Sequence, residues 1–526
     1  MRTTSITAAT QDQPRLRGFA LASVMTALML TLFLEALDQT VVGTAMPRII
    51  EALHGMDRYS WVVTAYILAT MTTIPIVGKL SDQFGRKWFL LCGTALFLLG
   101  SILAGASQSM DQLIVFRAIQ GLGSGIGIAL IGTIMADLFP PDQRAKCSGL
   151  FGLVYGVSNL FGPTIGGWLT EHGPLMGNLV TETTRWRWVF YINLPVGLIA
   201  VMALVIYLPA NLSLRTSKWN GWRSLLQIDF PGAILCAAAT ICLLLGLTWG
   251  GEQITAWTSP SVLSILAVAV LLFILFIVVE RNAHEPILPL DLFRNQIFSV
   301  GAALALLQNM VLLGLALYLP LYFQGVLAVS PTNAGLIMTP FSVSMVIGAI
   351  LSTQAIARIK RYRIIGIIAA LLMSLGAFLV TLMTPGTNIA LAIAILVLTG
   401  IGIGPFFSLP MVVVQNALPP DRLGISTAGL RYLGQLGASL GIAIVGTVVT
   451  SSVASNPMDH LSTTAASKDA LFIGLQHGFL TVLIFALIAL GVTFFLKEPH
   501  PQVAAENTKQ TDETSPEESA SELARR

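Results

Sequence analysis

The chain is divided into fourteen long apolar runs that are separated by short polar segments. Hydrophobic residues make up 55% of the sequence and charged residues only 10%, whereas a soluble domain averages about 25% charged residues. Each run is close to the ~20 residues that an α-helix needs to cross a bilayer. We therefore predict an all-α membrane protein whose spans lie near 19–45, 59–80, 87–106, 111–136, 146–169, 188–208, 229–249, 260–280, 297–323, 332–354, 363–383, 388–413, 423–450 and 471–496.

Lysine and arginine residues are distributed unevenly among the segments between these runs. If the N-terminus is cytoplasmic, most of them fall on the cytoplasmic side, and the outer segments hold only Arg48, Arg58, Arg185, Arg187 and Lys468. This bias matches the positive-inside rule, and an even number of spans then places both termini in the cytoplasm. Residues 1–17 are predicted to form a polar arm, and residues 497–526 a charged tail that stays disordered.

Two carboxylates interrupt the first apolar run. An ionised side chain at the bilayer centre costs roughly 2.5–3.5 kcal/mol on insertion scales, so Glu35 and Asp38 require protein or water beside them. Their spacing of three places them on nearly the same face of a helix, with Glu35 near the midplane and Asp38 about one turn further out. Arg117, six residues inside the fourth run, is the natural counter-ion. Either a structural salt bridge or a proton-coupling site fits this pattern.

The loop after the second run carries an acid, basic residues and two glycines within a tight turn. The residues that carry this pattern are Gly78, Asp82, Gly85, Arg86 and Lys87. The loop resembles the cytoplasmic signature between the second and third helices of the major facilitator superfamily. The resemblance implies a conformational gate in which the acid and the arginine hold two halves of the protein together. A second stretch, Leu113–Gly121 in the fourth run, resembles another motif of this superfamily, and that resemblance implies that Arg117 faces the first helix and takes part in proton transfer.

The fifth run contains closely spaced glycines and a proline: Gly156, Gly162, Pro163, Gly166 and Gly167. This segment resembles the antiporter signature of the same superfamily, although the spacing ahead of Gly162 departs from the simplest form. Glycines permit close helix approach, and the proline removes a backbone donor. The glycine pairs Gly121/Gly125 and Gly123/Gly127 of the fourth run are expected to serve helix contact as well.

Two further stretches narrow the resemblance to the fourteen-helix drug:proton antiporter branch of the EmrB/QacA type. They are Leu37–Pro47, where Met46 replaces the commoner leucine, and Trp186–Gly197. The resemblance implies two six-helix bundles and two additional helices. The predicted organisation is an arm at 1–17, an N-terminal bundle at 18–208, two additional helices with linkers at 209–295, a C-terminal bundle at 296–496 and a tail at 497–526.

The second half carries fewer polar signals. Gln308, Asn309 and Gln324 are candidates for lining a substrate cavity, but hydrogen bonds between helices explain them equally well. No histidine pair has a metal-ligand spacing, so we expect no metal site. A phosphate-binding Gly-Lys-Ser/Thr loop does not occur in the sequence, so we expect no cofactor and an ion gradient as the energy source.

The pattern predicts a proton-coupled antiporter of the plasma membrane, not an enzyme, that exports amphipathic and often cationic compounds by alternating access. A buried acid pair favours protonation, because like charges and desolvation both oppose ionisation. The expected partners are a small-molecule substrate, protons and lipid, with no nucleic acid, and the expected state is a monomer. A dedicated exporter of one metabolite or lipid uses the same machinery and stays open as an alternative. A membrane receptor or a membrane-embedded enzyme is less compatible, because the loops hold neither a folded domain nor paired metal-binding acids.

Overall fold

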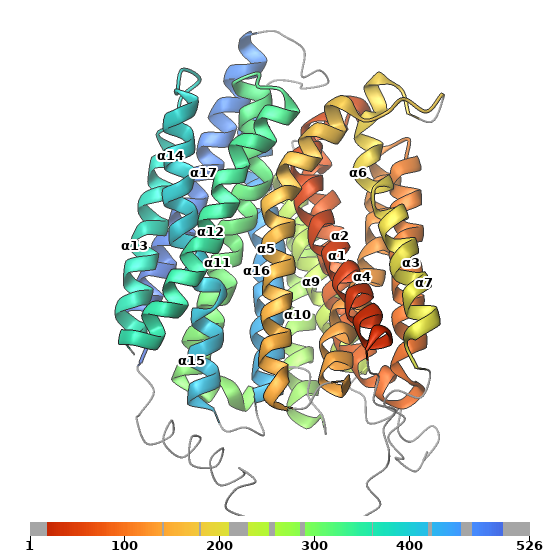
Figure 1. Ribbon diagram of the computed structural model, residues 1–526. Helices are drawn as coiled ribbons and strands as arrows, with labels where there is room; N and C mark the ends of the chain where they lie inside the picture. The colour runs from red at the N-terminus through yellow and green to blue at the C-terminus, as the bar shows by residue number, and fades with distance from the viewer. Residues whose placement is uncertain are drawn as a thin grey trace, which may run out of the picture.

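The computed structural model describes residues 18–138, 141–177, 180–209, 230–251, 258–283, 290–359, 361–418, 423–453 and 465–497. Within these ranges nearly every residue is helical, and the long helices run roughly side by side (Figure 1). The helices are α1 (Phe19–Leu53), α2 (Tyr59–Phe84), α3 (Arg86–Ala106), α4 (Met110–Leu138), α5 (Pro141–His172), α6 (Trp188–Tyr191), α7 (Asn193–Tyr207), α9 (Phe230–Gly251), α10 (Pro260–Asn282), α11 (Gln296–Leu321), α12 (Pro331–Ile359), α13 (Tyr362–Thr381), α14 (Ile389–Ile403), α15 (Leu409–Ala417), α16 (Leu423–Val453) and α17 (Ala465–Thr493).

The helices form two groups with a helix pair between them. In the first group α2 and α3 pack on α4, while α5 and α7 pack on α1. In the second group α11 packs on α16 and α17, and α14 packs on α12 and α13. Figure 1 shows the first group mainly on the right and the second mainly on the left, with α1 beginning and α17 ending at the lower end of the bundle.

Among the described residues, helix occupies most of each of the fourteen predicted ranges, and the family expectation of an all-α membrane fold is confirmed. Eleven segments of the described chain are long and apolar enough to cross a membrane by length and composition, and 59–74 and 234–247 are shorter apolar helices. The count of fourteen spans therefore stays a prediction. The range 388–413 differs from a single helix, because Gly404 and Pro405 open a short 3-10 segment (Gly404–Phe407) between α14 and α15.

The additional pair, α9 and α10, lies where the two groups meet. α9 packs against α10, α16 and α2. Its bonds to α16 lie near both ends: the hydroxyl of Thr447 donates to the carbonyl of Leu247 at 2.9 Å, and the thiol of Cys236 contacts the hydroxyl of Tyr432. Leu244 packs on Leu68 of α2. The outer member of the pair, α10, leaves most of its apolar surface exposed, as a lipid-facing helix does.

Candidate functional site

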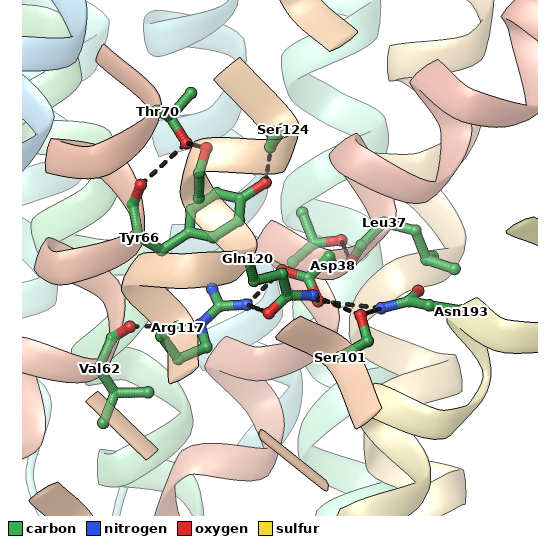
Figure 2. A network of polar contacts seen from close by, with 12 residues as sticks. Leu37, Asp38, Val62, Tyr66, Thr70, Ser101, Arg117, Gln120, Ser124 and Asn193 are labelled. Carbon is green, nitrogen blue, oxygen red and sulfur yellow. Dashed lines mark hydrogen bonds and ion pairs between the residues drawn. The ribbon is translucent and has the colours of Figure 1, made fainter. Parts of the chain in front are cut away.

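Asp38 lies at the centre of a buried polar network in the first helix group (Figure 2). One of its oxygens, Oδ2, accepts a hydrogen bond from Nη1 of Arg117 at 2.5 Å. The other, Oδ1, accepts from the side-chain amides of Gln120 at 2.9 Å and Asn193 at 3.2 Å. Asp38 is 1% exposed and Arg117 0%, so the pair is fully enclosed. Both carboxylate oxygens therefore have partners of the kind that an ionised aspartate needs.

Arg117 is held from several sides. Its Nη1 also donates to Oε1 of Gln120 at 2.7 Å, and its Nε donates to the carbonyl of Val62 at 3.3 Å. The guanidinium carbon lies 4.2 Å from the ring centroid of Tyr66 and 5.8 Å from that of Phe190. Cation–π contact and hydrogen bonds together replace the water that this cation loses inside the protein.

The network joins five helices of the first group. Ser101 of α3 accepts from Gln120 of α4 at 2.8 Å and from Asn193 of α7 at 3.1 Å. Tyr66 of α2 donates to Ser124 of α4 at 2.8 Å. Because Asp38 belongs to α1, the site fixes the relative positions of α1, α2, α3, α4 and α7. Hydrogen bonds that join five helices in this way restrict their relative movement, although Oδ1 of Asn193 has no partner among the described residues.

Glu35 lies one turn from Asp38 but has a different environment. Its side chain is buried, at 2% exposure, and its Oε2 has no hydrogen-bond partner within the described part of the chain. The carboxyl faces α4 at Gly127, where a Cβ atom would overlap Oε1 of Glu35. The sequence placed the two acids on nearly one face of the helix. In the structure, only Asp38 forms an ion pair with Arg117.

The glycines of α4 serve different purposes. Gly121 and Gly125 lie against backbone carbonyls of α2, and Gly123 lies against the backbone of α3. Helix contact therefore accounts for these three, as the sequence predicts. Gly127 instead leaves room for the carboxyl of Glu35, so its small size serves the acid rather than a neighbouring helix.

The glycine-rich segment of α5 lies between α1 and α12. At Gly162 and Gly166 an added Cβ atom would overlap threonine hydroxyls of α1, and at Gly167 it would overlap the first turn of α12. Gly335 of α12 similarly lies against the carbonyl of Pro163, whereas Gly156 meets only the side chain of Val346, at 3.7 Å. The segment thus brings the two helix groups into backbone contact.

Further contacts between the two groups lie toward the end that the sequence predicts to be the outer one. The hydroxyl of Tyr59 donates to the carbonyl of Leu317 at 2.5 Å, and Nε2 of Gln324 donates to the carbonyl of Thr44 at 2.9 Å. The hydroxyls of Thr164 on α5 and Thr339 on α12 also lie 2.5 Å apart. These bonds hold the outer ends of the groups together.

Glu171, beyond the predicted fifth span, accepts from the backbone amide of Thr332 at 3.1 Å, in the first turn of α12. Desolvation raises the pKa of Glu171, but hydrogen bonds from Thr332 and Ser330 and the charge of His172 lower it more, so the net shift is downward. The ionised form is the one that binds the end of α12, as expected for an anion at a helix N-terminus.

The structure places only part of the predicted gate. Gly85 links α2 and α3 with φ 92, a conformation that favours glycine. Arg86 is largely buried, and Nζ of Lys87 donates to the carbonyl of Val205 at 2.8 Å. The surroundings of Gly78 and the side chain of Asp82 lie outside the described part, so the gate stays a prediction.

The predicted cavity residues Gln308 and Asn309 are on α11. The amide of Asn309 donates to the carbonyl of Ala305 at 2.8 Å and to Oε1 of Gln308 at 3.0 Å. Gln308 is buried, and its Nε2 has no partner among the described residues. The amide of Asn309 thus donates its hydrogen bonds within α11, while Nε2 of Gln308 is available to donate to a ligand or to water.

Sequence reasoning missed five residues of the network: Tyr66, Ser101, Gln120, Ser124 and Asn193. Gln120 lies three residues after Arg117 and therefore shares its helix face, which is a signal that could have found it. Asn193 is a polar residue in an apolar run, directly before a Leu-Pro pair. Ser101 carries no such signal, because serine is common in membrane helices.

A bundle of apolar helices with a buried charge network defines a polytopic membrane protein. Residues 28–442 match the model of the Major Facilitator Superfamily. The chain belongs to this family, and it is a transporter rather than an enzyme.

Curated relatives share much of the sequence. The chain is 37% identical over 429 residues to Multidrug resistance protein 3 of Bacillus subtilis (strain 168), covering 81% of this chain and 79% of that protein. It is 34% identical to Multidrug transporter protein MdtP of the same organism, with coverage of 81% and 75%. Efflux pump dotC of Dothistroma septosporum (strain NZE10 / CBS 128990) is 33% identical, with coverage of 80% and 70%.

Solved structures share the fold at low sequence identity. A bacterial homologue of the human lysosomal transporter Spinster, in an inward-facing and occupied conformation, has a TM-score of 0.67 at 14% identity and covers 93% of this chain and 99% of its own. A D-xylose–proton symporter has a TM-score of 0.60 at 17% identity, with coverage of 91% and 98%.

Proposed function

We propose that this protein exports drugs and other toxic compounds in exchange for protons. The observation that carries the proposal is the enclosed group of Glu35, Asp38 and Arg117 inside the first helix bundle. Ionisable residues within membrane spans are rare and typically mark ion or substrate pathways. A proton is the smallest cation that could enter and leave so tightly enclosed a site.

The proposed substrates are amphipathic and often cationic small molecules. Relatives named a multidrug resistance protein, a multidrug transporter and an efflux pump support this substrate class. A buried carboxylate favours a cation, and apolar helix surfaces favour its hydrophobic part. No cofactor enters the proposal, because the proton gradient supplies the energy.

The proposed transport cycle is alternating access between the two helix groups. The bonds from Tyr59, Thr164, Glu171 and Gln324 hold the outer ends together. Release of a substrate to the outside requires these contacts to open while the opposite ends approach. Rocking of two repeats around a central site is the common mode in such transporters.

The finer assignments follow from the sequence pattern. We propose the fourteen-helix drug:proton antiporter branch, with α9 and α10 as the additional pair. The proposed location is the plasma membrane, with both termini in the cytoplasm, and the proposed state is a monomer. The basic residues at the ends of the helices support this orientation.

The test uses inverted membrane vesicles from an efflux-deficient bacterial host that expresses the full chain. Ethidium and tetraphenylphosphonium are suitable lipophilic cations, and accumulation is driven by an imposed pH gradient. We expect uptake that an uncoupler abolishes and that Asp38→Asn removes at equal expression. Proton-driven uptake that persists in Asp38→Asn would contradict the role of this network. Transport of neither cation, with no change in drug susceptibility, would favour a dedicated metabolite exporter.

A further inference from the structure

We propose that Glu35 is the group that carries the exchanged proton, while Asp38 and Arg117 remain an ion pair throughout the cycle. The inference rests on the proposed proton exchange and assigns its chemistry to one of two acids. It is carried by the different surroundings of the two carboxyl groups, which the sequence alone presents as equivalent.

Asp38 is poorly placed to take up a proton. Its two oxygens accept three hydrogen bonds, from Arg117, Gln120 and Asn193. Protonation would place a hydrogen among these donors and would leave the guanidinium of Arg117 without its counter-charge. Because arginine cannot lose its proton in a protein, the pair is stable only when Asp38 stays ionised.

Glu35 is placed for the opposite behaviour. Its Oε2 is enclosed without a partner, and the donors of the network are bonded to Asp38. A carboxylate charge is disfavoured where one of its oxygens is enclosed without a donor, whereas the neutral acid is tolerated there. The contact with Gly127 provides room beside the carboxyl rather than a donor. The buried position seen in this structure therefore suits a protonated Glu35.

Few charged or titratable groups lie near the carboxyl of Glu35. On α1 itself the neighbour is Asp38; α4 contributes Arg117 and α2 contributes Tyr66, which lies within electrostatic reach of both acids. The helices α7 and α11 have no charged residue, and α5 and α12 have charged residues only near their ends. The negative charge of Asp38 is balanced by Arg117, so the state of Glu35 depends mainly on its contact with water.

The proposed step is a simple proton transfer. When water from the cytoplasmic side reaches Glu35, its O–H bond breaks, the proton passes to that water, and the carboxylate that remains attracts a cationic substrate. On the outer side a proton from water binds the carboxylate and neutralises it, so the cation is released. One proton thus enters for each substrate that leaves, and no other reactant is required.

The experiment compares wild type, Glu35→Gln and Glu35→Asp as full-length protein. Ethidium is added to protein in weakly buffered detergent solution, and released protons are measured with a pH indicator. We expect wild type and Glu35→Asp to release a proton on binding, and Glu35→Gln to bind ethidium with no proton release and no pH dependence. In proteoliposomes, exchange of one proton for one monovalent cation should let a difference of about one pH unit support a roughly tenfold ethidium gradient. Glu35→Gln should not build up this gradient.

The control is Glu51→Gln, on the same helix, whose carboxylate forms an exposed ion pair with Arg48. It should match wild type in every measurement. A second variant, Gly127→Ala, keeps the acid but forces its carboxyl to move, and it should shift the pH midpoint of ethidium binding. This variant keeps the proposal testable if Glu35→Gln folds poorly.

Proton release by Glu35→Gln equal to that of wild type would overturn the assignment, and so would a Gly127→Ala midpoint equal to that of wild type. If wild type itself shows no proton-driven transport, the proposed function fails instead. The two failures are therefore distinguishable in one set of preparations.

Discussion

Removing either partner of the Asp38–Arg117 pair should destabilise the protein, but by unequal amounts. Breaking a fully buried ion pair by removing one partner costs about 3–5 kcal/mol. Asp38→Asn leaves an arginine that cannot become neutral, so its cost should lie at the upper end. Arg117→Gln leaves an aspartate that can take up a proton, so its cost should lie at the lower end. The double variant removes both charges and should be no worse than Arg117→Gln.

The assay is thermal unfolding of purified full-length protein in detergent, at one heating rate because such unfolding is often irreversible. A loss of 1 kcal/mol shifts the unfolding midpoint by about 2–4 °C in a unit of 150–250 residues, the size of one helix group. We therefore expect a shift of roughly 10 °C or more for Asp38→Asn and a smaller one for Arg117→Gln. The Arg117→Gln shift should shrink at acidic pH, because protonation removes the unpaired charge.

Two results would refute this reasoning. Equal shifts for the two single variants at all pH values would show that the unpaired charges are not enclosed. Shifts that add in the double variant would show that the two side chains are not coupled, because a coupled pair departs from additivity. Glu51→Gln again serves as the control, since exposed ion pairs contribute little.

Three further predictions concern the outer contacts and the turn between α2 and α3. Gly167→Leu places a side chain in the first turn of α12, so export should fail and a cysteine introduced at Thr164 should react faster with an impermeant maleimide added outside. The pKa of Glu171 is lowered by its contact with Thr332, so this contact is complete above the ordinary carboxyl pKa and is lost as pH falls through the lowered value. The same labelling should therefore accelerate in acid, and Glu171→Gln should remove that dependence. Gly85→Ala forces a non-glycine residue into a left-handed conformation at a cost of about 1–3 kcal/mol, which thermal unfolding would detect.

The helices could be predicted from the sequence because hydrophobic length alone determines them. A backbone in lipid must satisfy its own hydrogen bonds, so an apolar run of sufficient length becomes a helix. Local breaks depend on backbone chemistry as well: Gly404 and Pro405 interrupt an otherwise continuous apolar run. The packing of the helices into two groups came from the family resemblance, because periodicity does not say which apolar face meets which neighbour.

The site was only partly predictable. Charged side chains inside apolar runs must find partners, which identified Arg117 of the fourth run as the counter-ion of an acid in the first. The sequence could not choose between Glu35 and Asp38, because a spacing of three places both on one helix face. The two acids differ because Gln120 and Asn193, which lie on other helices, donate hydrogen bonds to Asp38. Which helices meet at Asp38 is determined only when the bundle is assembled.

The glycines of α4 show that residues with the same spacing in the sequence can have different roles in the structure. Gly123 and Gly127 form the same four-residue spacing as Gly121 and Gly125, and all four would be assigned to helix contact by sequence. Three of them do meet a backbone, but Gly127 meets the carboxyl of Glu35. A side chain at Gly127 would compete with the acid for space, so the absence of a side chain there keeps Glu35 inside the bundle. The position of the acid is therefore determined by two helices together, and a test of proton exchange must vary both.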